Sequence, residues 1–283
     1  MREDKIKNKK RSEVKIFPVP FALGEIEENV KINTISVSKY SIEQTIKQAI
    51  KFHSEGKILE AEKYYQELIN QGCNNHRVLS NYGVILRSLN KSKEAELSTR
   101  KAINLKPDFA DAYSNLGNIL RDLGNLKEAE LSTRKAINLK PDFANAYSNL
   151  GNILRDLGRL QEAKKSLRKA IQLNPNLAET HLNLGNVLRD LNQLKKAELS
   201  LLKAIELNPN FAEAHSNLGN ILRNLGKLKE AKLSLLKAIE LNPDFAQAHL
   251  NLGIILKDLN QLKEAELSLR KAIKINPIFA DAY

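Results

Sequence analysis

The chain has 283 residues, a formal net charge of +12 and one cysteine, Cys73. A single cysteine excludes a disulfide framework and favours a reducing compartment, so we expect a cytoplasmic protein. No stretch of the sequence approaches the roughly 20 consecutive apolar residues of a transmembrane helix, which argues against an integral membrane protein.

Residues 1–41 are predicted to form a disordered, basic N-terminal tail, because they carry no periodic apolar face. The first fifteen residues hold seven positive and three negative side chains. Such a run can contact nucleic acid or anionic lipid, but a solubilising tail is the favoured interpretation. Residues 16–24 also resemble a weak secretion signal, against which Pro18 and Pro20 argue.

Residues 42–75 are predicted to be a divergent N-terminal capping repeat. Ala49, Gly56 and Ala61 stand in the register of the repeats that follow, whereas Cys73 takes the place of their proline. Terminal repeats are usually atypical because one of their faces meets solvent. We interpret Cys73 as a small buried hydrophobic residue.

Six repeats of 34 residues follow over 76–279. Residues 96–129 recur at 130–163 with three changes, and a fixed period of this length marks units that bury their apolar faces only by stacking. The repeats are 76–109, 110–143, 144–177, 178–211, 212–245 and 246–279. The markers are Gly83, Gly117, Gly151, Gly185, Gly219 and Gly253, and Pro107, Pro141, Pro175, Pro209, Pro243 and Pro277.

Each repeat is predicted to be a pair of helices. Ala112, Leu116 and Ile119 recur at helical spacing, and a second apolar stripe begins at Leu126 after Gly124. Pro141 is expected to end the second helix and to start the next one, since proline is tolerated only at a helix beginning. The fold class that follows is an all-α solenoid.

These residues resemble the tetratricopeptide repeat family over 76–279. The matching positions are Tyr113, Leu116, Gly117, Ala129, Ala136 and Pro141. The resemblance implies a superhelical α-solenoid of 34-residue helix-turn-helix repeats, with the first helices lining a concave groove. His181, His215 and His249 depart from the family by replacing the aromatic residue, and we interpret them as core fillers.

Residues 280–283 are predicted to begin a further repeat. No closing polar helix follows them, so we expect apolar residues of the last repeat to be partly exposed and to allow end-to-end self-association. The residues concerned are Ile255, Leu259, Leu269 and Ile273.

The first helices are predicted to be electrically neutral, with seven basic and seven acidic side chains over the six repeats. The surplus positive charge therefore lies on the second helices and connectors. The basic residues are Arg77, Arg87, Arg121, Arg155, Arg189, Arg223 and Lys257. The acidic residues are Asp111, Asp122, Asp156, Glu179, Asp190, Glu213 and Asp258.

Asparagines recur in the first helices and form the candidate peptide-binding site. One set repeats once per repeat, and a second set follows three residues later on the same side of the helix. The first set is Asn81, Asn115, Asn149, Asn183, Asn217 and Asn251, and the second is Asn118, Asn152, Asn186 and Asn220. Each asparagine lowers the stability of its helix by up to roughly 0.7 kcal/mol relative to alanine, so we expect its amide to make a compensating contact.

A carboxamide both donates and accepts a hydrogen bond, which matches a peptide bond. The first set resembles the asparagine row in the repeat region of O-linked N-acetylglucosamine transferases, which grips substrate polypeptide. The structural alternative is that the amides bond to neighbouring repeats or to water, and it is the preferred interpretation of the second set.

We find no catalytic or metal-binding motif in the sequence and predict no cofactor, so we expect this chain not to be an enzyme. The three histidines are 34 residues apart and would be separated by about 10 Å in stacked repeats, too far to share a metal.

Three hypotheses on function remain. The favoured one is a non-catalytic scaffold that binds an extended polypeptide in the groove. The second is the substrate-recruiting region of a larger glycosyl- or other group-transferase that continues beyond Tyr283. The third and less favoured hypothesis is binding of nucleic acid or of a membrane surface by the basic convex face.

Overall fold

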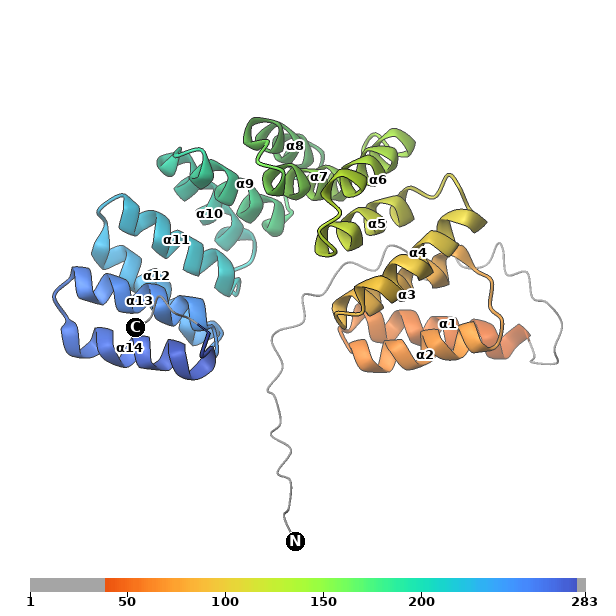
Figure 1. Ribbon diagram of the computed structural model, residues 1–283, viewed down its shortest axis with the longest axis horizontal. Coiled ribbons are helices and arrows are strands. Elements are labelled where there is room, and N and C mark those ends of the chain that lie inside the picture. Colours follow the sequence, from red (N-terminus) through yellow and green to blue (C-terminus); the bar gives the residue numbers. More distant parts are fainter. Residues whose placement is uncertain (1–38, 279–283) are drawn as a thin grey trace, which may run out of the picture. The chain divides into compact units, whose positions relative to one another are not determined.

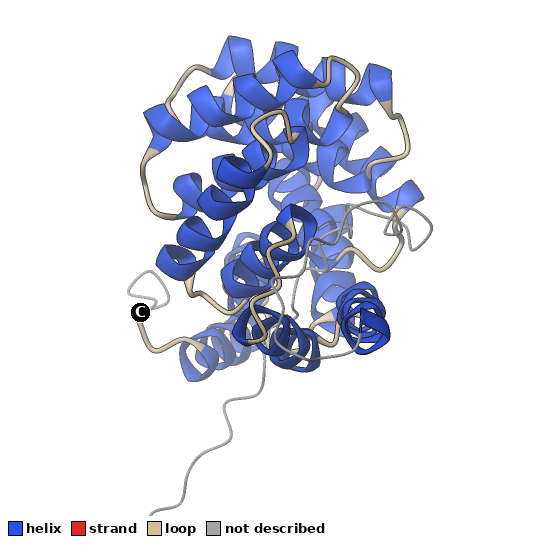
Figure 2. Ribbon diagram, turned by 90° about the vertical axis from the view of Figure 1, so that its right-hand side faces the viewer, coloured by secondary structure: helices blue, strands red, loops and turns tan. Residues whose placement is uncertain are grey.

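The computed structural model describes residues 39–278, which form fourteen α-helices and no β-strand (Figures 1 and 2). The prediction of an all-α solenoid of helix pairs is confirmed. The expected tail lies outside the described residues, apart from 39–41, which belong to the first helix, and the predicted start of a further repeat at 280–283 also lies outside them.

The helices alternate between a first and a second helix of each pair. The first helices are α1 (Lys39–Ser54), α3 (His76–Ser88), α5 (Ala110–Asp122), α7 (Ala144–Asp156), α9 (Ala178–Asp190), α11 (Ala212–Asn224) and α13 (Ala246–Asp258). The second helices are α2 (Ile58–Asn70), α4 (Ser92–Leu105), α6 (Leu126–Leu139), α8 (Leu160–Leu173), α10 (Leu194–Leu207), α12 (Leu228–Leu241) and α14 (Leu262–Ile275).

The chain divides between Pro141 and Asp142 into two compact halves. Within each half, a second helix packs against the first helix of its own pair and against the first helix of the next pair. First helices of successive pairs also touch, as α3 and α5 do in the N-terminal half and α11 and α13 in the C-terminal half. Each pair therefore buries its apolar side against its neighbours along the chain.

Small residues allow the two helices of a pair to lie close together. A Cβ atom on Gly151 of α7 would lie 2.5 Å from Cγ of Leu167 on α8, and one on Gly117 of α5 would collide with Oγ1 of Thr133 on α6. The alanines of the second helices are fully or almost fully buried at the same contacts. They are Ala95, Ala102, Ala129, Ala136, Ala163, Ala170, Ala197, Ala204, Ala231, Ala238, Ala265 and Ala272.

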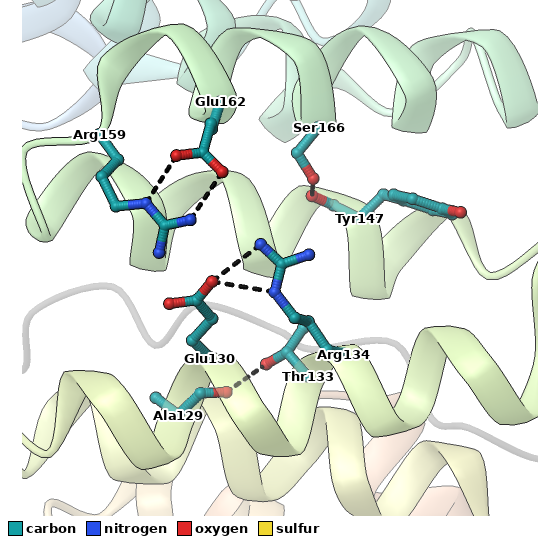
Figure 3. Close-up of polar contacts among 8 residues, drawn as sticks. All are labelled: Ala129, Glu130, Thr133, Arg134, Tyr147, Arg159, Glu162 and Ser166. Atoms are coloured by element: carbon teal, nitrogen blue, oxygen red, sulfur yellow. Dashed lines mark hydrogen bonds and ion pairs between the residues drawn. The ribbon is translucent and has the colours of Figure 1, made fainter.

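Hydroxyl groups add polar contacts to this packing (Figure 3). In the C-terminal half, Oγ of Ser166 on α8 donates to the carbonyl of Tyr147 on α7 at 2.8 Å. In the N-terminal half, Oγ1 of Thr133 donates to the carbonyl of Ala129 within α6 at 2.9 Å. These bonds satisfy the buried hydroxyls without interrupting the apolar contact between helices.

The turn inside each pair requires a left-handed backbone conformation. Gly124, Gly158 and Gly226 adopt φ of +79°, +74° and +76°, and Asn90 and Asn192 take the same place at +61° and +55°. Glycine enters this region without strain, and asparagine is one of the few other residues that does so routinely. The alternation of glycine and asparagine at this turn therefore has a backbone cause.

The prolines lie in the connectors between pairs and not at helix starts. Pro141 follows the end of α6 at Leu139 and precedes the start of α7 at Ala144. The prediction that the proline ends the second helix is correct, whereas the prediction that it starts the next helix is wrong. The connector adds a short turn, and the first residue of the next helix is an alanine in each repeat from α5 on.

The first pair, α1 and α2, has a well-buried core although its sequence diverges from the repeat pattern. Tyr65 and Leu68 of α2 are fully buried against Ile42 and Ile46 of α1 and against Ile85 of α3. Among the apolar residues named for the last repeat, Ile255 is fully buried, which corrects the expectation for that residue. The other three, Leu259, Leu269 and Ile273, are partly exposed.

Candidate functional site

The asparagines of the first set lie in the middle of the first helices. Each is the sixth residue of its helix, as Asn81 is in α3 and Asn115 in α5. The second set lies one turn further along the same side. We call the side of the first helices that carries these residues the first-helix face of each half, formed by α3 and α5 in the N-terminal half and by α7, α9, α11 and α13 in the C-terminal half.

In the N-terminal half, the asparagines contact the neighbouring first helix. Nδ2 of Asn115 on α5 donates to Oγ of Ser80 on α3 at 3.0 Å. Asn81 is 1% exposed, and its Oδ1 atom has no hydrogen-bond partner among the described residues. An unsatisfied buried oxygen of this kind costs about 1–3 kcal/mol of stability. Asn118 is partly exposed.

In the C-terminal half, two asparagines bond to each other. Nδ2 of Asn217 on α11 donates to Oδ1 of Asn186 on α9 at 2.9 Å. Asn251 of α13 accepts a bond of 3.0 Å from Nε2 of Gln247 one turn earlier, while its own Nδ2 group is buried without a partner. Nδ2 of Asn183 on α9 is likewise buried and unsatisfied within the described residues.

The structure therefore brings only part of the predicted site together. The pair Asn186 and Asn217 and the contact of Asn115 with Ser80 are bonds to neighbouring repeats, as the structural alternative expects. The remaining positions Asn149, Asn152 and Asn220 are partly exposed. On this face, Nδ2 of Asn183, Nδ2 of Asn251 and Oδ1 of Asn81 are buried without a hydrogen-bond partner among the described residues.

The sequence analysis did not assign a role to the small polar residues beside the asparagines. Ser80 accepts from Asn115, and Oγ1 of Thr180 on α9 donates to Oγ of Ser148 on α7 at 3.1 Å. A serine directly precedes the asparagine in four of the six repeats, and this recurrence is the signal that could have identified these contacts.

Ion pairs join the ends of successive first helices. Arg87 of α3 lies 2.5 Å from Asp122 of α5 in the N-terminal half. In the C-terminal half, Arg155 of α7 lies 2.5 Å from Asp190 of α9, and Arg223 of α11 lies 2.7 Å from Asp258 of α13. These three arginines of the first helices are therefore already engaged by carboxylates of the next first helix.

Asp190 receives a second arginine. Arg189, its neighbour in α9, lies 3.0 Å from the same carboxylate. Burial raises the pKa of Asp190, but the hydrogen bonds from Arg155 and Arg189 and the positive charges of these two side chains together outweigh that effect and lower the pKa below its ordinary value. The carboxylate therefore stays ionised at neutral pH and holds both cations.

The three histidines at the aromatic position anchor the connectors. Nε2 of His181 donates to the carbonyl of Pro175 at 2.9 Å, and His215 and His249 bond in the same way to Pro209 and Pro243 at 3.1 and 2.9 Å. His181 and His249 are buried, whereas His215 is partly exposed. Sequence reasoning missed the bond to the carbonyl six residues earlier.

The described residues contain no group of three or more histidine, cysteine, aspartate or glutamate side chains placed to hold a metal. Cys73 is buried, and this burial raises the pKa of its thiol, which disfavours the reactive thiolate. Within residues 39–278, the helices also include none that is both long and apolar enough to cross a membrane.

Family models match most of the array. A model described as TPR repeat matches residues 117–154, 151–188, 185–226 and 219–259. Two models described as tetratricopeptide repeat match 76–109 and 246–279, and 99–130. A search of curated proteins finds no match.

Solved structures of similar proteins include YrrB, described as a TPR protein with an unusual peptide-binding site. It is 33% identical, with a TM-score of 0.51, over 65% of this chain and 95% of YrrB. A thermophilic TPR protein of Thermus thermophilus is 25% identical, with a TM-score of 0.58, over 64% of this chain and 99% of its own. A chain of the APC/C hetero-tetramer Cut9–Hcn1 is 20% identical, with a TM-score of 0.74, over 83% of this chain and 46% of its own, and indicates the fold alone.

Proposed function

Because the chain belongs to the tetratricopeptide repeat family, we propose that it is a non-catalytic, cytoplasmic scaffold whose first-helix face binds an extended polypeptide. The observation that carries the proposal is the pair of buried, unsatisfied amide donors on Asn183 and Asn251. Each lies in a helix interior, where asparagine is unfavourable. Both Nδ2 atoms are covered in the unliganded chain, so each could donate to a peptide carbonyl once its side chain rotates toward the ligand.

The likeness to YrrB supports this proposal, since that protein is described as having a peptide-binding site and this chain spans 95% of it. The charge of the face also supports it. Arg87, Arg155 and Arg223 are paired with aspartates, so the face presents amides and hydroxyls more than free cations. A neutral polypeptide backbone suits such a surface, because removing its amides from water costs less free energy than removing a charged ligand from water.

The resemblance of the asparagine row to that of O-linked N-acetylglucosamine transferases supports an alternative within the same proposal. In that case the face recruits substrate polypeptide for a group-transferase domain encoded beyond Tyr283. Sequencing the coding region past this residue separates the two versions, because a free-standing scaffold requires no catalytic domain.

The binding face is tested by alanine substitution. A library of displayed peptides of about 12 residues is selected on the native chain, and the best peptide is labelled and titrated against variants. Each amide bond to the peptide contributes about 0.5–1.5 kcal/mol, so the triple variant Asn149→Ala, Asn183→Ala and Asn251→Ala should bind one to three orders of magnitude more weakly. Its helix content should hold or rise, since alanine is the better helix former.

A matched control replaces Asn104 and Asn138, which lie near the ends of the second helices α4 and α6, by alanine. This variant should bind the peptide as the native chain does. The affinity should also change little with salt, whereas labelled duplex DNA bound by lysine and arginine would dissociate steeply as salt rises. Tight, salt-sensitive DNA binding that the asparagine substitutions leave unchanged would contradict the proposal.

A further inference from the structure

A row of leucines is exposed on the second helices of the C-terminal half. Leu199 on α10, Leu233 on α12 and Leu267 on α14 keep 67%, 66% and 70% of their surface exposed. They stand 34 residues apart, and Leu97 and Leu131 occupy the same position in the N-terminal half. A single exposed leucine needs no explanation, but a row of them on adjoining helices marks a contact surface.

The three helices that carry the row are neighbours. Lys227, directly before α12, lies 2.7 Å from Glu198 of α10, and Lys232 of α12 lies 3.2 Å from Glu264 of α14. Leu202 and Leu236 are also exposed, three residues after Leu199 and Leu233 on the same side of their helices. The leucines therefore form one apolar strip that crosses α10, α12 and α14.

Lysines flank this strip on both sides, four residues before and four residues after each leucine, and thus on the same side of the helix. The first row is Lys195, Lys229 and Lys263, and the second row is Lys203, Lys237 and Lys271. Within each helix the two rows are eight residues apart, which corresponds to about 12 Å along an α-helix.

The first lysine row makes no ion pair with another described residue. In the second row, Lys203 and Lys237 pair with Glu206 and Glu240 one turn later, at 2.6 and 2.7 Å. These pairs are exposed and weak, so the lysines can exchange them for carboxylates of a ligand. We call the leucine strip and its two lysine rows the second-helix strip.

We propose that the second-helix strip binds an amphipathic α-helix of a partner protein, with acidic side chains along both edges of its apolar stripe. The helix would lie across α10, α12 and α14, on a surface distinct from the first-helix face. An α-helix with its side chains is about 10–12 Å wide, which matches the separation of the lysine rows. Apolar contact at the centre and opposite charges at both edges make the surfaces complementary.

The same charges argue against two other occupants. A second copy of this chain would bring lysine rows against lysine rows if it docked through the same strip. A bilayer with anionic headgroups would attract the lysines, but it would not require two rows separated by the width of a helix. The observed spacing therefore favours a helix over a lipid surface.

The chain itself provides a natural interruption of the strip. On α8, the preceding second helix of the same half, Lys165 replaces the leucine and Gln161 replaces the first lysine. The triple variant Leu199→Lys, Leu233→Lys and Leu267→Lys extends that interruption along the whole strip. Because these side chains are largely exposed, the variant should keep the native helix content.

The test uses two labelled helical peptides of about 21 residues that share a leucine stripe, one with glutamates and one with lysines along both edges. Titration of the full chain should show micromolar binding of the acidic peptide and at least about tenfold weaker binding of the basic one. The triple lysine variant should lose about tenfold or more in affinity for the acidic peptide. The variant Lys165→Leu should bind it equally or more tightly.

Charge reversal provides the second arm. Lys195→Glu, Lys229→Glu and Lys263→Glu together should abolish the preference for the acidic peptide, while the triple alanine variant of the first-helix face should leave it unchanged. Equal binding of both peptides by the native chain, or acidic-peptide binding that survives both triple variants, would overturn the proposal. The proposal would also be overturned if the native chain bound neither peptide and instead sedimented with vesicles of phosphatidylserine and phosphatidylcholine.

Discussion

Arg189 binds the carboxylate of Asp190, its own neighbour in α9, at 3.0 Å, whereas Arg155 and Arg223 bind the aspartate of the following repeat. The difference has a local cause, because the residue of α11 that corresponds to these aspartates is Asn224. The contact between α9 and α11 thus lacks the charged pair that joins α7 to α9 and α11 to α13.

Restoring this carboxylate should strengthen the contact. We expect Asn224→Asp to draw Arg189 across to α11 and to stabilise the C-terminal half by about 0.2–1 kcal/mol at low salt, with the gain shrinking as salt screens the pair. Urea unfolding of the full chain at low and high ionic strength measures this. Asp258→Asn, which removes the equivalent pair with Arg223, should have the opposite sign, and a gain independent of salt would contradict the explanation.

The buried histidine of the first pair should make that pair sensitive to acid. His53 is 1% exposed, its Nδ1 lies 3.5 Å from the hydroxyl of Tyr65, and burial lowers its pKa to about 4 from 6.5. Between these values the unfolded chain binds a proton that the folded chain does not, so stability falls as pH drops from about 6.5 to about 4. The full loss is about 3 kcal/mol.

Hydrogen-exchange protection of amides in α1 and α2, followed over this pH range, reports the loss locally. The variant His53→Phe cannot take up the proton and should flatten the pH dependence of protection in these two helices. His76 of α3, whose pKa burial also lowers to about 4, remains in both proteins and serves as an internal comparison. Identical pH profiles for the native chain and His53→Phe would show that His53 is not responsible.

The left-handed turn position can be tested by exchanging the two residues that the chain itself uses there. Gly124→Ala should destabilise by about 1 kcal/mol, because alanine is strained at φ +79°, although no atom lies within 4 Å of the added Cβ. Gly124→Asn should cost clearly less, since Asn192 and Asn260 hold the same place. Thermal unfolding compares the two variants, and equal melting temperatures would exclude a backbone cause.

The close approach of α7 and α8 should make Gly151 intolerant of a side chain. Gly151→Ala gains about 1 kcal/mol of helix propensity but places Cβ 2.5 Å from Cγ of Leu167, and overpacking of this kind costs about 1–3 kcal/mol. We expect net destabilisation. A double-mutant cycle with Leu167→Ala checks the assignment, because the alanine at Gly151 should be tolerated once the leucine is shortened, and strict additivity would contradict the clash.

Local chemistry explains why the helix pairs could be predicted from the sequence. Helices are interrupted at fixed places by residues with a left-handed backbone conformation, such as Gly124 and Asn192, and by prolines such as Pro141. Apolar residues at helical spacing fill the segments between these places. The start of α7 at Ala144 was not predicted, because a proline is equally compatible with the first turn of a helix and with a connector before it.

The candidate site was less predictable, because a side-chain amide can bond in several directions. Asn217 bonds to Asn186, whereas Asn115 bonds to Ser80, although Asn115 and Asn217 occupy the same position of the repeat. The choice depends on distances between neighbouring helices, which the helical period does not specify. The exposure of Leu199 also escaped the sequence analysis, since a leucine within an apolar second helix is expected to face the core.

The near-identical segments 96–129 and 130–163 show how the array can change its length. Their three differences, Asp111 to Asn145, Asn125 to Arg159 and Lys127 to Gln161, all fall at positions that are exposed or partly exposed. A duplicated pair brings with it both surfaces needed to dock on its neighbours, so insertion or loss of 34 residues creates no unmatched interface. Unequal recombination could therefore lengthen or shorten the protein in whole steps, while its surface diverges one residue at a time.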